Sequence, residues 1–273
     1  MTETGLSNSG EPREGQDRDL DFTGKTVLVT GSGRNIGKAI ALEFASRGAN
    51  IIVNARSNRD EAEAVAHAAK ALGAKAIVAM GDVAQKNTIG EMKDVAERVF
   101  GRVDIYVSNA ARRMHQDFFA IPDEEWQYHF DQVLSAARNL ALAFVPPMQE
   151  AGYGRIIHMS GIDAMAGGWS RVPASTAKAG LRAFTKSLAE GLGPYGITVN
   201  EINPGVVDTV RDLTTHPTFA DPARKSQIAE QIPIRRLTDP ADVAFTCAFL
   251  CSPRAGAITG SMIHVDGGRD MRG

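Results

Sequence analysis

The feature that most constrains the fold of this chain is a repeated alternation of short apolar runs with longer amphipathic segments. The apolar runs are rich in β-branched residues, which is typical of strands buried on both faces of a parallel sheet. They predict strands at residues 26–30, 50–55, 75–80, 103–107, 154–160 and 198–202, and the amphipathic segments predict helices at 36–47, 60–72, 88–100, 122–148 and 175–191. Because crossover helices must cover both faces of such a sheet, the alternation predicts a doubly wound α/β fold.

The 273 residues contain no internal repeat and no internal linker, so we expect a single domain over residues 21–273. Residues 1–20 lack periodicity and an apolar stretch, which predicts a disordered tail rather than a signal peptide. The least regular part of the domain is 206–236, which contains Pro217, Pro222 and Pro233. Long excursions beyond strand ends often cover ligand sites, so we expect this segment to be a substrate lid.

The charge balance argues against two classes of partner. The chain has 30 Lys and Arg residues and 32 Asp and Glu residues, which predicts no basic surface for nucleic acid or for an anionic membrane. No apolar run is long enough to span a bilayer as a helix. Cys247 and Cys251 lie four residues apart on a predicted helix, where we expect them to pack as small apolar residues. We therefore expect a reducing, cytoplasmic setting and no metal centre.

A glycine-rich turn follows the first predicted strand and precedes the first predicted helix. Its sequence, Thr-Gly-Ser-Gly-Arg-Asn-Ile-Gly, spans residues 30–37. Glycines let the backbone approach a pyrophosphate, and the N-terminus of the following helix offers free N–H groups to it. Asn35 occupies a position at which a glycine is expected, and asparagine tolerates unusual backbone angles better than most residues. The turn therefore indicates a dinucleotide site.

Further segments follow this turn in an order that resembles the short-chain dehydrogenase/reductase family. The turn itself is similar to the family's Thr-Gly-x-x-x-Gly-x-Gly loop. The other similar elements are the adenine-contacting pair Asp82 and Val83, the Ser-Asn-Ala-Ala element at 108–111, Lys178 at the opening of a long helix, the nicotinamide-clamping segment 203–209 and the C-terminal signature at 265–268. The resemblance covers about residues 22–268. It implies a Rossmann-type fold, a nicotinamide cofactor, a small-molecule substrate, and a homotetramer or homodimer.

The resemblance also implies which residues bind the cofactor. They are Gly31, Ser32, Arg34, Asn35, Ile36, Gly37, Asn54, Arg56, Ser57, Asp82, Val83, Asn109, Ala110, Ala111, Lys178, Pro204, Gly205, Val207 and Thr209. Sites specific for NAD end the second strand with a carboxylate that binds the ribose hydroxyls. Here Ala55 stands at that position and Arg56 follows, and Arg34 lies in the glycine-rich turn. A guanidinium favours the 2′-phosphate of NADP(H), although both arginines are also consistent with solvated side chains.

The resemblance implies a catalytic set of Asn, Ser, Tyr and Lys, of which only Lys178 is present. Ala174 occupies the tyrosine position, Gly161 the serine position and Val133 the asparagine position. None of the four tyrosines is followed by a lysine four residues later, so no shift of register restores the motif. Hydride addition to a ketone creates an alkoxide that must be protonated in place, so the missing groups matter for the reaction.

Other side chains are candidates for this proton transfer, and each also has a purely structural interpretation. His115 can exchange a proton near neutrality or is an ordinary loop residue. Asp163 is a donor or caps a turn, and Ser175 is a donor or packs at a helix start. Ser160 precedes Gly161, but neighbouring side chains on a strand face opposite sides.

Three residues are candidates for contact with the substrate. Arg113 and Arg171 would attract an anionic group, or they are solvated. Trp169 would line an aromatic or apolar site, or it packs against the lid.

The sequence therefore predicts an NADP(H)-dependent oxidoreductase with a non-standard active site. Its substrate would be a small carbonyl compound, an imine or iminium ion, or an activated carbon–carbon double bond. An iminium ion and an activated double bond make a small demand for acid–base catalysis. Two alternatives stay open: a catalytically inactive NADP-binding protein that acts as a sensor or oligomer partner, and a lyase or isomerase on the same fold. The residues do not identify the substrate or the direction of the reaction.

Overall fold

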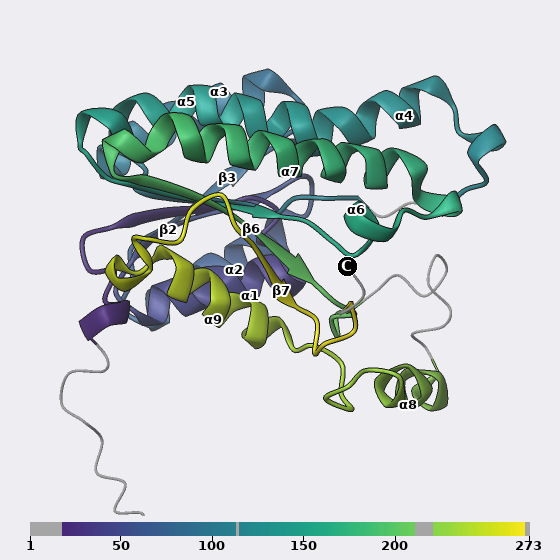
Figure 1. Ribbon diagram of the computed structural model, residues 1–273. Helices are drawn as coiled ribbons and strands as arrows, with labels where there is room; N and C mark the ends of the chain where they lie inside the picture. Colours follow the sequence, from purple (N-terminus) through teal and green to yellow (C-terminus); the bar gives the residue numbers. More distant parts are fainter. Residues whose placement is uncertain (1–17, 113–114, 211–220, 271–273) are drawn as a thin grey trace, which may run out of the picture.

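The computed structural model describes residues 18–112, 115–210 and 221–270, and it contains a parallel sheet flanked by helices (Figure 1). The seven strands lie in the order β3-β2-β1-β4-β5-β6-β7. Their bounds are β1 (Thr26–Val29), β2 (Asn50–Ala55), β3 (Ala76–Met80), β4 (Ile105–Ser108), β5 (Gly154–Met159), β6 (Ile197–Pro204) and β7 (Met262–Val265). The predicted α/β class with a doubly wound parallel sheet is confirmed.

The helices form two layers, one on each face of the sheet (Figure 1). One layer contains α1 (Asn35–Ser46), α2 (Arg59–Ala71) and α9 (Pro240–Cys251). The other contains α3 (Lys86–Phe100), α4 (Asp123–Phe130), α5 (Ala136–Glu150) and α7 (Val172–Leu192). Two further helices, α6 (Asp163–Ala166) and α8 (Pro222–Glu230), lie on the side of the sheet toward which the β6 arrow points.

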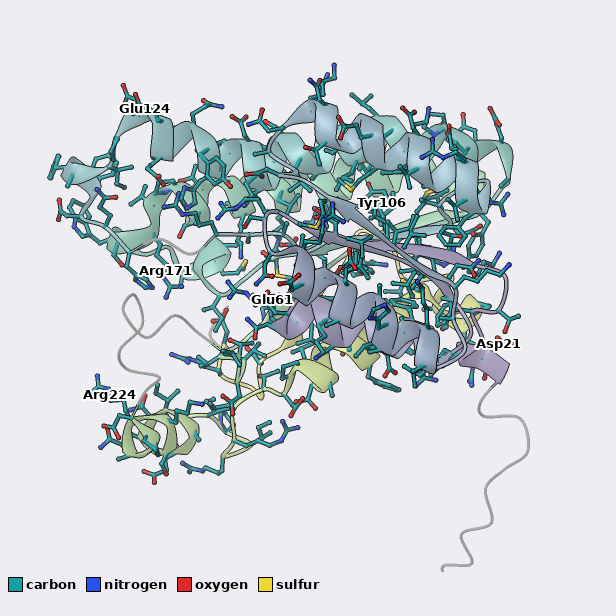
Figure 2. All side chains as sticks on the ribbon, turned by 180° about the vertical axis from the view of Figure 1, so that it is seen from behind. Asp21, Glu61, Tyr106, Glu124, Arg171 and Arg224 are labelled. Atoms are coloured by element: carbon teal, nitrogen blue, oxygen red, sulfur yellow. The ribbon has the colours of Figure 1, made fainter. Side chains whose placement is uncertain are left out.

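The apolar runs form strands because both of their faces are buried. In β1, Val27 and Val29 belong to the core beneath α1, α2 and α9, whereas Leu28 belongs to the core beneath α3, α5 and α7. All three side chains are fully buried. Tyr106 of β4 is also fully buried and lies in the interior (Figure 2). A strand that buries both faces needs apolar residues at successive positions, which explains the continuous runs in the sequence.

The site is positioned by the point at which the strand order reverses. β1 lies between β2 and β4, and in folds of this kind ligands bind beyond the carboxyl ends of the strands at such a point. Thr30 and Asn109 join the two segments that leave β1 and β4. The Thr30 hydroxyl accepts a hydrogen bond from the Asn109 backbone N–H at 2.9 Å, and Asn109 Nδ2 donates to the Thr30 carbonyl at 2.9 Å.

The long helix predicted at 122–148 is interrupted. A single π-helical turn, η3 (Asp131–Ser135), separates α4 from α5. Val133 lies in this turn and packs with Ala137 and with Ala177 and Leu181 of α7. π turns insert one residue into a helix and rotate the faces on either side of it. The apolar residues of α4 and α5 read as one continuous pattern in the sequence, so they did not reveal the π turn between the two helices.

The chain enters the fold earlier than predicted. Residues 1–17 lie outside the described structure, but Arg18–Leu20 forms a short 3-10 helix, η1. Leu20 packs against the core, and Asp19 pairs with Arg254 at 2.9 Å, so these contacts correct the expected boundary at residue 20. Cys247 and Cys251 are buried free thiols on α9, as predicted. Within the described residues, no helix combines the length and apolar character needed to cross a membrane.

Candidate cofactor and catalytic site

The glycine-rich turn connects β1 to α1 and is tied to the end of β2. Asn54 Oδ1 accepts from the Gly31 backbone N–H at 3.1 Å, and the Asn54 carbonyl accepts from the Ser32 N–H at 2.7 Å. Asn35 has φ 52°, a left-handed conformation that asparagine adopts more readily than most residues. No side chain caps the N-terminus of α1 in the described structure. The free N–H groups and the helix dipole there suit an anionic group such as a pyrophosphate.

Gly37 packs directly against this turn. A Cβ atom there would overlap the Gly31 carbonyl oxygen and lie 2.7 Å from Asn109 Nδ2. We expect Gly37→Ala to destabilise the fold by about 1–3 kcal/mol, because overpacking displaces the backbone. Thermal unfolding and titration with NADPH should both detect the change.

Gly90→Ala is the matched control for this substitution. Gly90 lies inside α3, and an added Cβ there would meet no described atom within 4 Å apart from the adjacent backbone of the helix itself, so alanine should raise stability by up to about 1 kcal/mol. Equal unfolding temperatures for the two variants would contradict the close packing at Gly37.

The predicted adenine end contains a hydrogen-bond network centred on Tyr128 of α4. The Tyr128 hydroxyl donates to Asp82 Oδ2 at 2.7 Å and accepts from Arg56 Nη1 at 3.1 Å. Gln132 Nε2 also donates to this hydroxyl, at 3.2 Å. Burial and the bond to Asp82 raise the pKa of Tyr128. The structure thus joins two predicted cofactor residues, Arg56 and Asp82, through a tyrosine that was not predicted to be part of the site.

The segment after β6 is held against the glycine-rich turn by Asn35. The Asn35 Nδ2 donates to the Val210 carbonyl at 3.0 Å, and the Asn35 Oδ1 accepts from the Val210 N–H at 3.0 Å. Val207 is buried and forms a bridge with Thr238. Gly205 lies so close to the C-terminal signature that an added Cβ would be 2.7 Å from Asp266 Cα. The end of the predicted nicotinamide segment is therefore held beside the predicted pyrophosphate turn.

Lys178 belongs to the first half of α7, and its side chain reaches the end of β5. Its Nζ donates to the Ser160 carbonyl at 2.7 Å, and a Cβ at Gly161 would lie 3.0 Å from that Nζ. Ala174 is one helical turn before Lys178. Ser175 is buried, and its hydroxyl has no partner among the described residues. The structure therefore brings together the positions at which the family resemblance expects serine, tyrosine and lysine.

The candidates His115 and Trp169 lie on two segments that contact each other, one after β4 and the other before α7. The Gln116 N–H donates to the Ser170 carbonyl at 3.0 Å, and His115 Nδ1 lies 3.4 Å from the Ser170 hydroxyl. Trp169 Nε1 donates to Asp117 Oδ2 at 2.8 Å. The Trp169 ring contacts those of Phe118 and Phe119 in an exposed aromatic cluster.

Three of the predicted residues need separate mention. Arg113 lies outside the described residues. Asp163 is the first residue of α6, and its side chain is not described. Arg171 ends the short 3-10 helix that begins at Trp169. It lies on the same side of the molecule as Arg224 of α8 (Figure 2).

Glu201 is a further residue that the sequence reasoning missed. It lies inside β6 and is 1% exposed, and burial raises the pKa of its carboxyl group. The Ser160 hydroxyl, Arg182, Lys178 and His264 act on it in the opposite direction. The available signal was a single carboxylate in a run predicted to be a buried strand. Buried charges are rare unless they are paired or functional, so this residue merited attention from the sequence alone.

His158 neighbours Glu201 on β5. Its Nδ1 lies 2.8 Å from the Thr185 hydroxyl, and burial lowers its pKa to about 3. It is therefore neutral near physiological pH.

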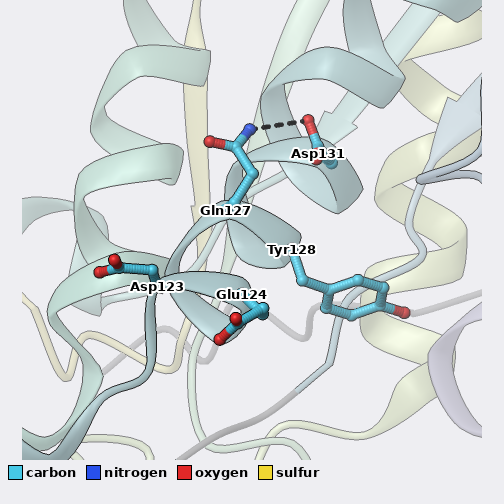
Figure 3. A pocket seen from close by; sticks show the side chains of 5 residues that line it. All are labelled: Asp123, Glu124, Gln127, Tyr128 and Asp131. Atoms are coloured by element: carbon cyan, nitrogen blue, oxygen red, sulfur yellow. Dashed lines mark hydrogen bonds between the residues drawn. The ribbon is translucent and has the colours of Figure 1, made fainter.

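Two open hollows lie on the surface of the described structure. A hollow of about 470 Å³ is lined by Asp123, Glu124, Gln127, Tyr128 and Asp131, and the Tyr128 ring points away from Gln127 and Asp131 (Figure 3). A groove of about 650 Å³ runs along β7 and α9, and His264 and Asp266 belong to its lining. Neither lining includes Lys178, so the candidate catalytic residues are not defined by these hollows.

Similar proteins match nearly the whole chain. A family model described as enoyl-(acyl carrier protein) reductase matches residues 31–270. The chain is 36% identical over 247 residues to the 3-oxoacyl-(acyl-carrier-protein) reductase FabG of Staphylococcus epidermidis, a match that covers 90% of this chain and 99% of that protein. The protein of the same name from Escherichia coli is 36% identical over 252 residues, with 92% and 100% coverage.

Solved structures with the same architecture contain bound nicotinamide cofactors. The L-sorbose reductase of Gluconobacter frateurii, complexed with NADPH and L-sorbose, has a TM-score of 0.86 and 33% identity over 91% of this chain and 97% of that chain. A gluconate 5-dehydrogenase from Burkholderia cenocepacia, in complex with NADP and tartrate, has a TM-score of 0.84 and 26% identity, with 94% and 99% coverage.

Proposed function

Because this chain belongs to the short-chain dehydrogenase/reductase family, we propose that it is an NADP(H)-dependent oxidoreductase. Its substrate class is a small carbonyl compound, an iminium ion or an activated carbon–carbon double bond. The observation that supports this function best is the position of Lys178 beside Ser160, at the sheet edge that also bears the uncapped N-terminus of α1. The similarity to structures that contain NADPH or NADP supports the choice of cofactor.

The residues present fit this cofactor. Gly37 lets α1 pack closely against the glycine-rich turn, and the free N–H groups of α1 would bind the pyrophosphate oxygens. Ala55 presents no carboxylate, so Arg56 can bind the 2′-phosphate without a repulsive neighbour at that position. Lys178 would hold the nicotinamide ribose. When bound, the cofactor supplies a hydride to the substrate.

The chemistry available to the side chains favours a substrate with a modest need for a proton. Ala174 and Gly161 provide no hydroxyl group beside Lys178, and Val133 is packed in an apolar cluster with α7. An iminium ion needs no proton after it accepts a hydride, because the product is a neutral amine. For this reason we rank iminium ions and activated double bonds above simple ketones.

The proposal includes a substrate lid over residues 206–236, of which 211–220 lie outside the described residues. Within it, α8 buries no side chain and stands away from the main body (Figure 1). The ion pair between Lys225 and Asp208, at 2.7 Å, connects α8 to the end of the segment that leaves β6. A homodimer or homotetramer remains part of the proposal.

A panel of carbonyl compounds, imines and enones tests this function through the absorbance of NADPH. We expect NADPH binding by fluorescence and oxidation with at least one member of the panel. Lys178→Met should reduce that turnover by about a hundredfold or more, because positioning and charge at the reacting centre are lost. NADPH binding with no oxidation by any substrate would favour an inactive NADP-binding protein. Unchanged turnover in Lys178→Met would show that the site lies elsewhere.

A further inference from the structure

The side chain of Glu201 faces α7 from the centre of β6. In the parallel sheet, Glu201 pairs in register with His158 of β5 and with Met262 of β7. Residues paired in register project from the same face of a sheet. His158 contacts the hydroxyl of Thr185 on α7, so this face is the one covered by α7. A carboxylate is therefore buried beneath the helix that contains Lys178.

Two cations of α7 reach the sheet on either side of this carboxylate. Lys178 Nζ donates to the Ser160 carbonyl at the end of β5. Arg182, one turn later, directs its guanidinium toward Met262 Sδ of β7 at 3.5 Å. Glu201 belongs to the strand between them, and both positive charges lower the pKa of its carboxyl group. The arrangement couples the charge of Glu201 to that of Lys178.

Three buried oxygen atoms on this face have no hydrogen-bond partner among the described residues. They are Ser160 Oγ, Glu201 Oε1 and Asn203 Oδ1. The Ser160 hydroxyl is near enough to lower the pKa of Glu201, yet it makes no hydrogen bond of ordinary geometry to it. Buried polar atoms of this kind bind ordered water or a ligand. The cluster can therefore accept the hydrogen bonds along which a proton moves.

The cluster reaches solvent at its other end, through His264 of β7. Asn203 Nδ2 lies 3.3 Å from His264 Nδ1, and the histidine side chain is 36% exposed in the groove beside β7. The charged or titratable groups that face Glu201 are therefore Lys178 and Arg182 above it, His158 on one side and His264 on the other. Burial outweighs the cations, so the net effect is a raised pKa.

We propose that Glu201 is a positioning residue that supplies Lys178 with the proton consumed at the candidate active site. This step rests on the proposed function, in which NADP(H) and a substrate bind beside Lys178. After a hydride has added to a carbonyl compound or an activated double bond, Lys178 Nζ gives a proton to the resulting alkoxide or enolate and becomes a neutral amine. Its lone pair then takes the proton of the Glu201 carboxyl group, which becomes a carboxylate. Water in the groove beside His264 returns a proton to Glu201, and the hydride of the bound cofactor accounts for both electrons.

An infrared titration tests the link between Glu201 and Lys178 without any substrate. The wild-type protein should have the carbonyl stretch of a protonated carboxylic acid at a pH above the ordinary glutamate range of about 4.3. This band should be absent from Glu201→Gln and unchanged in Glu190→Gln, a control on an exposed residue of α7. In Lys178→Met, the midpoint at which the band disappears should move to higher pH, because a neighbouring positive charge is lost.

Kinetics separates a proton-supplying role from a purely structural one. For a carbonyl compound or enone that proves to be a substrate, Glu201→Gln should lower kcat by about tenfold to a hundredfold, flatten the pH profile and leave the Kd of NADPH within about twofold. Glu201→Asp should recover part of the loss, and it replaces Glu201→Gln if that variant fails to fold. A band that survives in Glu201→Gln, or a midpoint unaffected by Lys178→Met, overturns the proposal. Absence of NADPH oxidation in the wild-type protein instead overturns the proposed function, and the infrared result still reports the coupling.

Discussion

Replacing Arg56 with glutamate is expected to weaken NADPH binding by about a hundredfold and to leave NADH binding within about twofold. A hydrogen bond to a charged group contributes about 1.5–3 kcal/mol, and the new carboxylate would also repel the 2′-phosphate. NADH has a hydroxyl group at that position, so it loses no such bond. Fluorescence titration of both cofactors measures the two affinities directly.

Arg59→Glu is the matched control for this prediction. Arg59 lies three residues further on, is exposed, and pairs only loosely with Glu63 at 3.3 Å. The same change of charge there should alter both affinities by less than about threefold, because exposed charges at a distance are screened by salt. A parallel loss of NADPH and NADH affinity in Arg56→Glu would mean that the arginine supports the fold through Tyr128 rather than binding a phosphate.

Introducing a tyrosine and a serine beside Lys178 is expected to create a ketone reductase. In the double variant Ala174→Tyr with Gly161→Ser, we expect NADPH-dependent reduction of simple ketones at least about a hundredfold above the parent protein, the usual contribution of a positioned acid. Ala174 lies one turn before Lys178 and is half-buried, so a phenol can project beside the lysine. A serine at 161 would displace only the flexible end of Lys178.

The controls for this gain of activity are the two single variants and a triple variant with Lys178→Met. Each single variant should gain little, and the triple variant should lose the new activity, because the three groups act as a unit. Steady-state assays with a ketone panel measure all four proteins. A double variant that is folded and binds NADPH but reduces no ketone would contradict the identification of Ala174 and Gly161 as the altered positions.

The strands of the sheet were predictable because the apolar pattern that marks each strand lies within that strand's own residues. A strand buried on both faces, such as β1, needs an unbroken apolar run, and the glycine-rich turn follows it directly. The family resemblance then predicted that segments distant in the sequence meet at the same edge of the sheet. The π turn was not predictable in this way, because Val133 is apolar in either interpretation and only its contact with α7 reveals the change of register.

The site was harder to predict where it depends on pairs of residues distant in the chain. Tyr128 and Gln132 share a helix face by their spacing, but no local pattern indicates that this face turns toward Asp82 of the segment after β3. Glu201 was visible as a charge in an apolar strand, yet its neighbours Lys178 and Arg182 come from a helix that precedes it. Such contacts follow from the three-dimensional arrangement alone.

Asn35 shows how a backbone requirement can be combined with a long-range bond. Its left-handed conformation costs a residue other than glycine about 1 kcal/mol, and glycine would avoid that cost. The amide group compensates with two hydrogen bonds to Val210, a residue 175 positions away in the chain. The glycine-rich turn is thereby joined to the end of the segment that leaves β6. If the dinucleotide binds at this turn as proposed, we expect its rate of release to depend on these two hydrogen bonds.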